Sequence, residues 1–203
     1  QRWALGKSGG MTNVVALNGS LRARTPIENY HGIMFRNICV TILGHHRIVL
    51  IVRRPRRKPV PGNVERAFLA ELAAGGIKTG EYNLPDWEET PEGLARLLDN
   101  LFRVTPPTAL IVDETPLLFA TMQFLLKRGI KVPDQVSLIA TDYDASLEWC
   151  HPSLAHIRWD SASVIRRVLR WAAAARSGRS DRQVRNCPAE FVPGGSIGPA
   201  PAE

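Results

Sequence analysis

The 203-residue sequence is poor in cysteine and aromatic residues, and it contains no long hydrophobic run. Its three cysteines, Cys39, Cys150 and Cys187, form no close pair. That spacing supports neither a zinc knuckle nor a disulfide scaffold and indicates reduced thiols. No segment approaches the roughly 18 continuous apolar residues of a membrane helix, so we expect no membrane partner. At 44% hydrophobic residues, the composition predicts a globular protein with a proper core.

Recognisable catalytic motifs are also missing. "LGKSGG" (5–10) contains Gly-Lys-Ser but lacks the first glycine and the spacing of a phosphate-binding loop. There is no nucleophile elbow and no zinc-type histidine spacing, and we interpret the adjacent His45 and His46 as caps of a helix end. The paired carboxylates of Asp113 and Glu114 could support acid–base chemistry, but they have no partner nucleophile. We therefore expect no enzyme, no cofactor and no metal.

Positive charge is in excess and partly concentrated in one stretch. The net charge is +7 and the pI is about 9.8, which permits binding to nucleic acid or to anionic ligands. "RRPRRKPVP" (53–61) carries five basic residues, and its prolines favour a stiff, extended loop. The chain begins with Gln1, and no secretory signal follows. We expect a fragment whose natural start lies upstream.

From residue 46 onward, strand-like and helix-like segments alternate. Short apolar runs rich in β-branched residues predict buried strands at 47–52, 109–114 and 136–141, and a weaker strand at 80–87. Helical spacing predicts helices at 63–76, from Thr90 with an apolar stripe that extends to Leu101, and from Thr115 to about residue 126. This order is typical of a parallel sheet with helices on both faces, a doubly wound α/β fold.

The flanks of this block are less regular. We expect a strand at 13–20, a helix at about 28–43, and a short strand near 189–192. A further helix from about Ser161 to Arg176 has an apolar stripe that predicts an inward face. The stripe consists of Val164, Ile165, Val168, Leu169 and Ala172.

Polar residues follow the predicted strands directly. Arg53 and Arg54 follow the first, Asp113 and Glu114 end the third, and 141–144 (Thr-Asp-Tyr-Asp) ends the fourth. In open parallel sheets, ligands bind beyond the carboxyl ends of the strands. Carboxylates and guanidinium groups at this edge make directional hydrogen bonds to a hydroxylated ligand. The alternative is that these charges neutralise one another or are solvated.

Four stretches occur in the order found in sugar-responsive regulators of the LacI/GalR type. They are "LGHHRIVLIV" (43–52), 106–144 from "PPTALIVDE" to "ATDYD", "HPSLAHIRWD" (151–160) and "EFVPGGS" (190–196). The sequence resembles the effector domain of that family over roughly 33–197. "WEETPEGL" (87–94) and "HIRWD" (156–160) resemble the subgroup of xylose-operon regulators more closely.

The resemblance implies the type I periplasmic-binding-protein fold, with two doubly wound lobes joined by crossovers. Residues 46–150 would form the second lobe, and 185–203 the return to it and the tail. Residues 1–45 would be a remnant of the first lobe, and 151–184 a crossover segment belonging to it. One lobe would be complete and the other truncated. The DNA-binding head would lie outside this chain.

The resemblance also implies roles for particular residues. Asp142 and Glu114 fall where the family bonds sugar hydroxyls, and Asp113, Tyr143 and Arg54 lie beside them. The family's arginine in the first helix is replaced by Val64, so Arg66 or the basic loop would substitute, or the effector differs. Helix and loop positions used for dimer contacts fall on Phe119, Met122 and Trp149, for which core packing is the alternative. The basic loop would lie at the rim of the effector cleft rather than act as a DNA arm.

The leading hypothesis is a cytoplasmic, homodimeric sensor domain of a bacterial transcription regulator. A small effector, expected to be a sugar, would close the lobes and alter the spacing of the DNA-binding heads. One alternative is an extracytoplasmic solute-binding protein of a sugar transporter or receptor, recognised by a secretory signal upstream. A third is an enzyme on a similar sheet, recognised by turnover of a sugar.

Overall fold

The computed structural model describes residues 44–53, 62–159, 161–179 and 189–201. The chain divides into two compact units, Gln1–Thr25 with Asp160–Cys187, and Pro26–Trp159 with Pro188–Glu203. The second unit contains every strand of the described residues. The strand expected at 13–20 and the helix at 28–43 lie outside the described residues.

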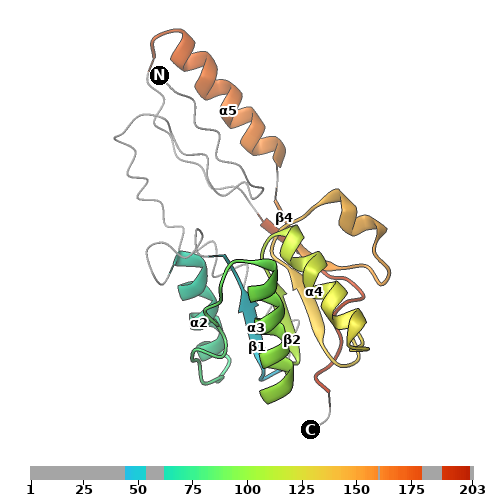
Figure 1. Ribbon diagram of the computed structural model, residues 1–203. Coiled ribbons are helices and arrows are strands. Elements are labelled where there is room, and N and C mark those ends of the chain that lie inside the picture. The colour runs from blue at the N-terminus through green and yellow to red at the C-terminus, as the bar shows by residue number, and fades with distance from the viewer. Residues whose placement is uncertain (1–43, 54–61, 160, 180–188, 202–203) are drawn as a thin grey trace. The chain divides into compact units, whose positions relative to one another are not determined.

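The second unit is built on a five-stranded sheet in the order β1-β2-β3-β4-β5 (Figure 1). The first four strands run parallel and the last is antiparallel to β4, so the sheet is mixed but mostly parallel. Its strands are β1 (Ile48–Ile51), β2 (Ala109–Val112), β3 (Ser137–Ala140), β4 (Ala155–Trp159) and β5 (Ala189–Val192). Every residue of β1, β2 and β3 is buried, as expected for strands covered on both faces. The α/β fold expected from the sequence is confirmed.

Two hydrophobic cores lie on opposite faces of this sheet because successive strand residues point to opposite sides. One face packs against α3 (Pro91–Val104) and α4 (Thr115–Lys127), with Leu98 and Leu118 fully buried. The other face packs against α2 (Asn63–Ala74), mainly through Phe68 and Leu72. Figure 1 shows these three helices flanking the strands. The helices predicted from residue spacing are therefore confirmed.

The strand expected at 80–87 does not form, and this prediction was wrong. The segment forms a turn instead, and Asn83 in this turn makes hydrogen bonds with backbone groups of β1. The backbone N–H of Leu50 donates to the carbonyl of Asn83 at 2.9 Å, and the Asn83 side-chain amide donates to the carbonyl of Ile48 at 2.8 Å. Asn83 is buried, so one side chain replaces part of a strand ladder.

β4 lies within the segment 151–184 that the sequence analysis gave to the first lobe. The structure pairs it with β3 and β5, and the division between the two units falls after Trp159 rather than after residue 150. The short strand expected near 189–192 is confirmed as β5, which pairs with β4 from His156↔Val192 to Trp159↔Ala189.

The C-terminal segment after β5 makes hydrogen bonds with β3 and β4 near their amino-terminal ends. Ser196 is fully buried; its hydroxyl donates to the carbonyl of Leu138 at 2.6 Å and accepts from the N–H of Ala155 at 2.9 Å. His45 is also buried, and its Nε2 lies 3.0 Å from the carbonyl of Gly198. The ring of His45 therefore contacts the C-terminal segment, and the helix end that His45 and His46 were expected to cap lies outside the described residues.

The described part of the first unit is α5 (Ser161–Arg176) and the residues up to 179. The helix is confirmed, but its apolar stripe does not face inward as expected. Ile165 is 54% exposed and Leu169 is 63% exposed. Periodicity correctly identified one apolar face without identifying what covers it. Within the described ranges, no helix is long and apolar enough to cross a membrane.

Candidate ligand-binding site

The strand register aligns polar residues at the carboxyl edge of the sheet. Ile51, Val112 and Ala140, the last residues of β1, β2 and β3, pair with one another in a row. The ladder continues one residue further, because the N–H of Asp113 donates to the carbonyl of Ile51 at 2.9 Å and that of Thr141 to the carbonyl of Val112 at 3.1 Å. Two rows of side chains follow from this alignment.

The first row joins Asp113 to Thr141. The Thr141 hydroxyl donates to Oδ1 of Asp113 at 2.6 Å, and both side chains are buried, Asp113 being 3% exposed. A carboxylate in such a place needs donors to offset the loss of water. Asp113, expected as a ligand contact, thus holds the ends of two neighbouring strands together.

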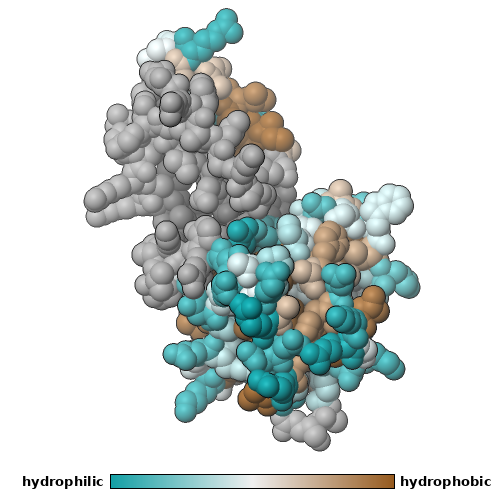
Figure 2. Space-filling model, viewed as in Figure 1, coloured by the Kyte–Doolittle hydropathy of each residue, from teal (hydrophilic) through white to brown (hydrophobic). Residues whose placement is uncertain are grey.

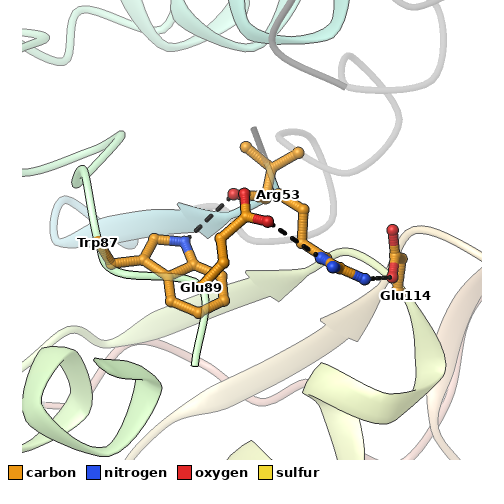
Figure 3. Close-up of polar contacts among 5 residues, drawn as sticks. Arg53, Trp87, Glu89 and Glu114 are labelled. Carbon is orange, nitrogen blue, oxygen red and sulfur yellow. Dashed lines mark hydrogen bonds and ion pairs between the residues drawn. The ribbon is translucent and has the colours of Figure 1, made fainter. Parts of the chain in front are cut away.

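The second row contains Arg53 and Glu114. The Arg53 guanidinium lies between two carboxylates, with Nη1 3.2 Å from Oε2 of Glu114 and Nε 3.4 Å from Oε2 of Glu89 (Figure 3). The hydrogen bond and charge of Glu114 raise the pKa of Arg53 above its ordinary value, Glu89 adds to this, and burial opposes it. Asp142 is half-buried and lies two residues after the end of β3.

Glu114 has an unusual backbone. Its φ of 63° and ψ of 133° make it the one non-glycine residue with positive φ in the described residues. It precedes the first turn of α4, yet its side chain makes no capping hydrogen bond and points instead to Arg53. Such a conformation costs on the order of 1–3 kcal/mol and persists where the surroundings impose it, often at functional sites.

Glu89 reaches Arg53 because a buried tryptophan fixes its loop. Trp87 is 7% exposed, and its Nε1 donates to the carbonyl of Val52, directly after β1, at 3.2 Å (Figure 3). Thr90 then caps α3 by accepting from the N–H of Gly93 at 2.9 Å. An open recess of about 430 Å³ is lined by Asp86, Trp87, Glu88 and Glu89.

The other residues considered for the site are Tyr143, Arg54 and Arg66. Tyr143 is exposed, its hydroxyl donates to Glu148, and its ring lies 5.2 Å from that of His156. Hydrogen bonding to Glu148, with burial and the charge of Glu148 in support, raises the pKa of Tyr143. Arg54 lies outside the described residues. Arg66, considered as a substitute for the family's arginine, is exposed on α2.

Sequence reasoning missed Arg53, Glu89 and Trp87. Arg53 was one of five basic residues in its stretch, and only the register shows that it stands in the row of Glu114. Glu89 and Trp87 were part of the segment expected to run from a strand into a loop. The usable signal was the "WEE" of 87–89, an aromatic residue beside two carboxylates just before a capped helix.

Among the predicted dimer residues, Trp149 and Phe119 are exposed and Met122 is not. Trp149, in the short 3₁₀ helix Ala145–Trp149, is 91% exposed, and Phe119 on α4 is 41% exposed. Met122 is half-buried and packs against the core beneath α4. Figure 2 shows apolar surface interrupting the hydrophilic face of the second unit.

In open α/β sheets, ligands bind beyond the carboxyl ends of the strands, and polar side chains gather at that edge here. The sequence profile of the periplasmic binding protein-like domain matches residues 41–197, so the chain belongs to that family. A comparison with curated protein sequences found no match.

Solved structures of transcription regulators share the fold. The Escherichia coli transcriptional repressor ascG is 19% identical with a TM-score of 0.68, covering 84% of this chain and 61% of its own. A LacI family regulator from Enterococcus faecium with bound ribose is 18% identical with a TM-score of 0.68, covering 85% and 63%. The regulator CelR in complex with cellobiose is 18% identical with a TM-score of 0.66, covering 83% and 51%. The chain thus spans between half and two thirds of the length of these structures.

Proposed function

We propose that this chain is the effector-sensing and dimerising part of a bacterial transcription regulator of the LacI/GalR type, and that its effector is a sugar. The observation that carries the proposal is the ion pair of Arg53 with Glu114, together with Asp142 two residues after β3, at the carboxyl edge of a periplasmic binding protein-like sheet. Similar structures bind cellobiose and ribose, and all three are transcription regulators, which favours this function over transport.

In the proposed mechanism, Asp142 and Glu114 accept hydrogen bonds from sugar hydroxyls, and the basic loop that includes Arg54 lies at the rim of the site. Asp113 contributes indirectly by holding Thr141. Carboxylates suit this task because each oxygen accepts more than one hydrogen bond. Sugar binding favours a closed arrangement of two lobes and so changes the spacing of DNA-binding heads carried outside this chain. The protein works in the cytoplasm and turns over no substrate.

The division into lobes is part of the same proposal. The second unit, with its five-stranded sheet, forms one lobe, and the first unit, Gln1–Thr25 with Asp160–Cys187, belongs to the other. We assign the chain to the xylose-operon-regulator-like subgroup on "WEETPEGL" (87–94) and "HIRWD" (156–160). The first of these stretches contains Trp87 and Glu89, which support Arg53 in the site.

Dimerisation is assigned to the surface around Trp149 and Phe119. A tryptophan that is 91% exposed is unusual on a monomer, and tryptophan is enriched where partner surfaces are anchored. Met122, predicted for the same role, is half-buried on α4 and packs against the core.

The test is calorimetric titration of the full-length protein with xylose, ribose and cellobiose, repeated with Asp142→Ala. At least one sugar is expected to bind, and loss of Asp142 is expected to weaken binding about tenfold or more, since a charge-assisted hydrogen bond contributes roughly 1.5–3 kcal/mol. Asp134→Ala, on an exposed turn, is the matched control and is expected to bind normally. Equal affinity of the Asp142 variant and the parent protein would contradict the assignment.

A further inference from the structure

One hydrogen bond joins the two residues that immediately precede the proposed sugar contacts. Asp113 comes directly before Glu114, and Thr141 comes directly before Asp142. The Thr141 hydroxyl donates to Oδ1 of Asp113 at 2.6 Å, across 28 positions of sequence. This bond therefore links the segment after β2 to the segment after β3, at the residues that adjoin both proposed carboxylates in the chain.

The bond lies inside the protein. Thr141 is 6% exposed and Asp113 is 3% exposed, so water competes little for the hydroxyl. A hydrogen bond from a hydroxyl to a carboxylate is among the shorter and stronger kinds. A threonine has one hydroxyl proton, and because Asp113 accepts it, Thr141 has none to donate to a sugar. Thr141 therefore orients the chain at this point and is not a hydrogen-bond donor to the ligand.

Asp142 lies between two anchored residues. On one side, the Thr141 N–H donates to the carbonyl of Val112 at 3.1 Å, and the Thr141 hydroxyl is held by Asp113. On the other side, the Asp144 carboxylate caps the short 3₁₀ helix that follows. Asp142 is half-buried, so its side chain is partly accessible on a backbone that is anchored before and after it.

The two groups on Cβ of Thr141 have different tasks. The methyl group fills buried volume, and deleting it lowers stability. The hydroxyl fixes the direction of the side chain next to Asp142. A binding group works well only when it is held within about 0.5 Å of its productive geometry. Loss of the hydroxyl is therefore expected to lower sugar affinity separately from any effect on stability.

We propose that Thr141 is a positioning residue of the effector site, whose hydroxyl, held by Asp113, keeps the Asp142 carboxylate oriented for the sugar before the sugar arrives. Thr141 acts through Asp142 and makes no contact of its own with the ligand. This inference rests on the proposed function and adds how the site maintains its geometry. It gives the bond between Thr141 and Asp113 a role in affinity beyond the joining of two strands.

The experiment is calorimetric titration of the full-length protein with xylose, ribose and cellobiose, using two variants of one residue. Thr141→Val keeps the shape of the side chain and removes the donor, so sugar affinity is expected to fall about fivefold. Thr141→Ser keeps the donor and removes the buried methyl group, so the melting temperature is expected to fall while the affinity stays within about twofold of the parent protein. Under a purely structural role, the affinities of both variants would follow their melting temperatures.

A double-mutant cycle identifies the residue through which Thr141 acts. In protein that already carries Asp142→Ala, Thr141→Val is expected to weaken binding by less than about twofold, because the carboxylate that it positions is gone. A hydroxyl that contacted the sugar directly would instead show its full effect in that background.

Thr121→Val is the matched control. Thr121 lies on α4 and is fully buried, and its hydroxyl has no hydrogen-bond partner within the part of the chain that the structure describes. The substitution is expected to leave sugar affinity at the parental value and not to lower the melting temperature, because no hydrogen bond is lost. Thermal unfolding of every variant verifies folding.

The outcomes separate the two proposals. Parental affinity of a folded Thr141→Val variant overturns the positioning role and leaves sugar sensing intact. An affinity loss of equal size in Thr141→Ser, or an undiminished effect of Thr141→Val in the Asp142→Ala protein, overturns it in the same way. If no sugar binds the parent protein, the proposed function fails and this inference fails with it.

Discussion

Thr141 and Asp113 join the ends of two parallel strands through a buried hydrogen bond of 2.6 Å. Thr141→Val keeps the shape of the side chain but removes the donor. The free energy of unfolding is expected to fall by about 1–3 kcal/mol, because a buried carboxylate loses a partner. Urea unfolding measures this change. Thr79→Val, an exposed threonine before the turn at 80–84, is the control and is expected to stay within about 0.5 kcal/mol. An equal effect of the two variants would contradict the role given to this bond.

Ser196 is the attachment point of the C-terminal segment. Ser196→Ala removes both a donor to the Leu138 carbonyl and an acceptor for the Ala155 N–H inside the protein. We expect a loss of about 2 kcal/mol in unfolding free energy. Ser177→Ala, an exposed serine after α5, serves as the comparison. Hydrogen exchange at Ala155 provides a local check, since its amide protection should drop in the Ser196 variant alone.

Gly93 packs closely against the loop that carries Glu88 and Glu89. A Cβ at Gly93 would stand 1.9 Å from the backbone oxygen of Glu88, so Gly93→Ala must displace the loop that carries Glu89. We expect destabilisation of about 1–3 kcal/mol and weaker sugar binding together. At Gly80 no atom lies within 4 Å of the corresponding Cβ, and Gly80→Ala is expected to change neither quantity. A Gly93 variant with parental stability would show that the loop yields without cost.

Tyr82 is expected to make the free energy of unfolding depend on pH in the alkaline range. Burial raises the pKa of Tyr82 to about 12, opposed by the nearby charge of Arg47, and its hydroxyl donates to the carbonyl of Thr105 at 3.0 Å. The folded pKa lies above the unfolded value, so this contribution is complete below about pH 10 and is lost as the pH rises to about 12. Across this pH window, the free energy of unfolding measured with denaturant should fall less steeply with pH for Tyr82→Phe than for the parent protein. Identical slopes would contradict the burial of this phenol.

Trp149 tests the proposed dimer. Trp149→Ala is expected to leave the stability of the subunit nearly unchanged, because the side chain is 91% exposed. It should raise the dimer dissociation constant by about 30-fold, as loss of a central tryptophan typically costs about 2 kcal/mol. Sedimentation at several concentrations measures this constant. Val104→Ala, 74% exposed at the end of α3, is the control and is expected to have no effect on it.

Sequence reasoning succeeded where the signal is local. The runs of β-branched residues in β1, β2 and β3, and the Thr90 cap of α3, depend on neighbours along the chain, and each was predicted within a few residues. The segment at 80–87 was missed because its structure depends on Asn83 reaching β1, 35 residues earlier in the chain.

The candidate site shows the same limit. That acids would follow β2 and β3 was visible in the sequence, since carboxyl ends of parallel strands share one edge. That Arg53 would meet Glu114 was not, because this contact joins residues 61 positions apart in the chain. On α5, the periodicity of Ile165 and Leu169 marks an apolar face, but burial depends on contacts that periodicity does not contain.

The pairing of Trp159 with Ala189 has a consequence for how the polypeptide is organised. β4 ends and β5 begins at directly opposed residues, so the second unit closes in space although 29 residues of sequence separate the two strands. The segment of the first unit that lies between β4 and β5 in the sequence is therefore an insertion at the turn position of a β-hairpin. A two-residue turn is enough to connect antiparallel neighbours. We therefore expect the sheet-bearing unit, Pro26–Trp159 with Pro188–Glu203, to fold as one uninterrupted polypeptide when a short turn replaces the inserted segment.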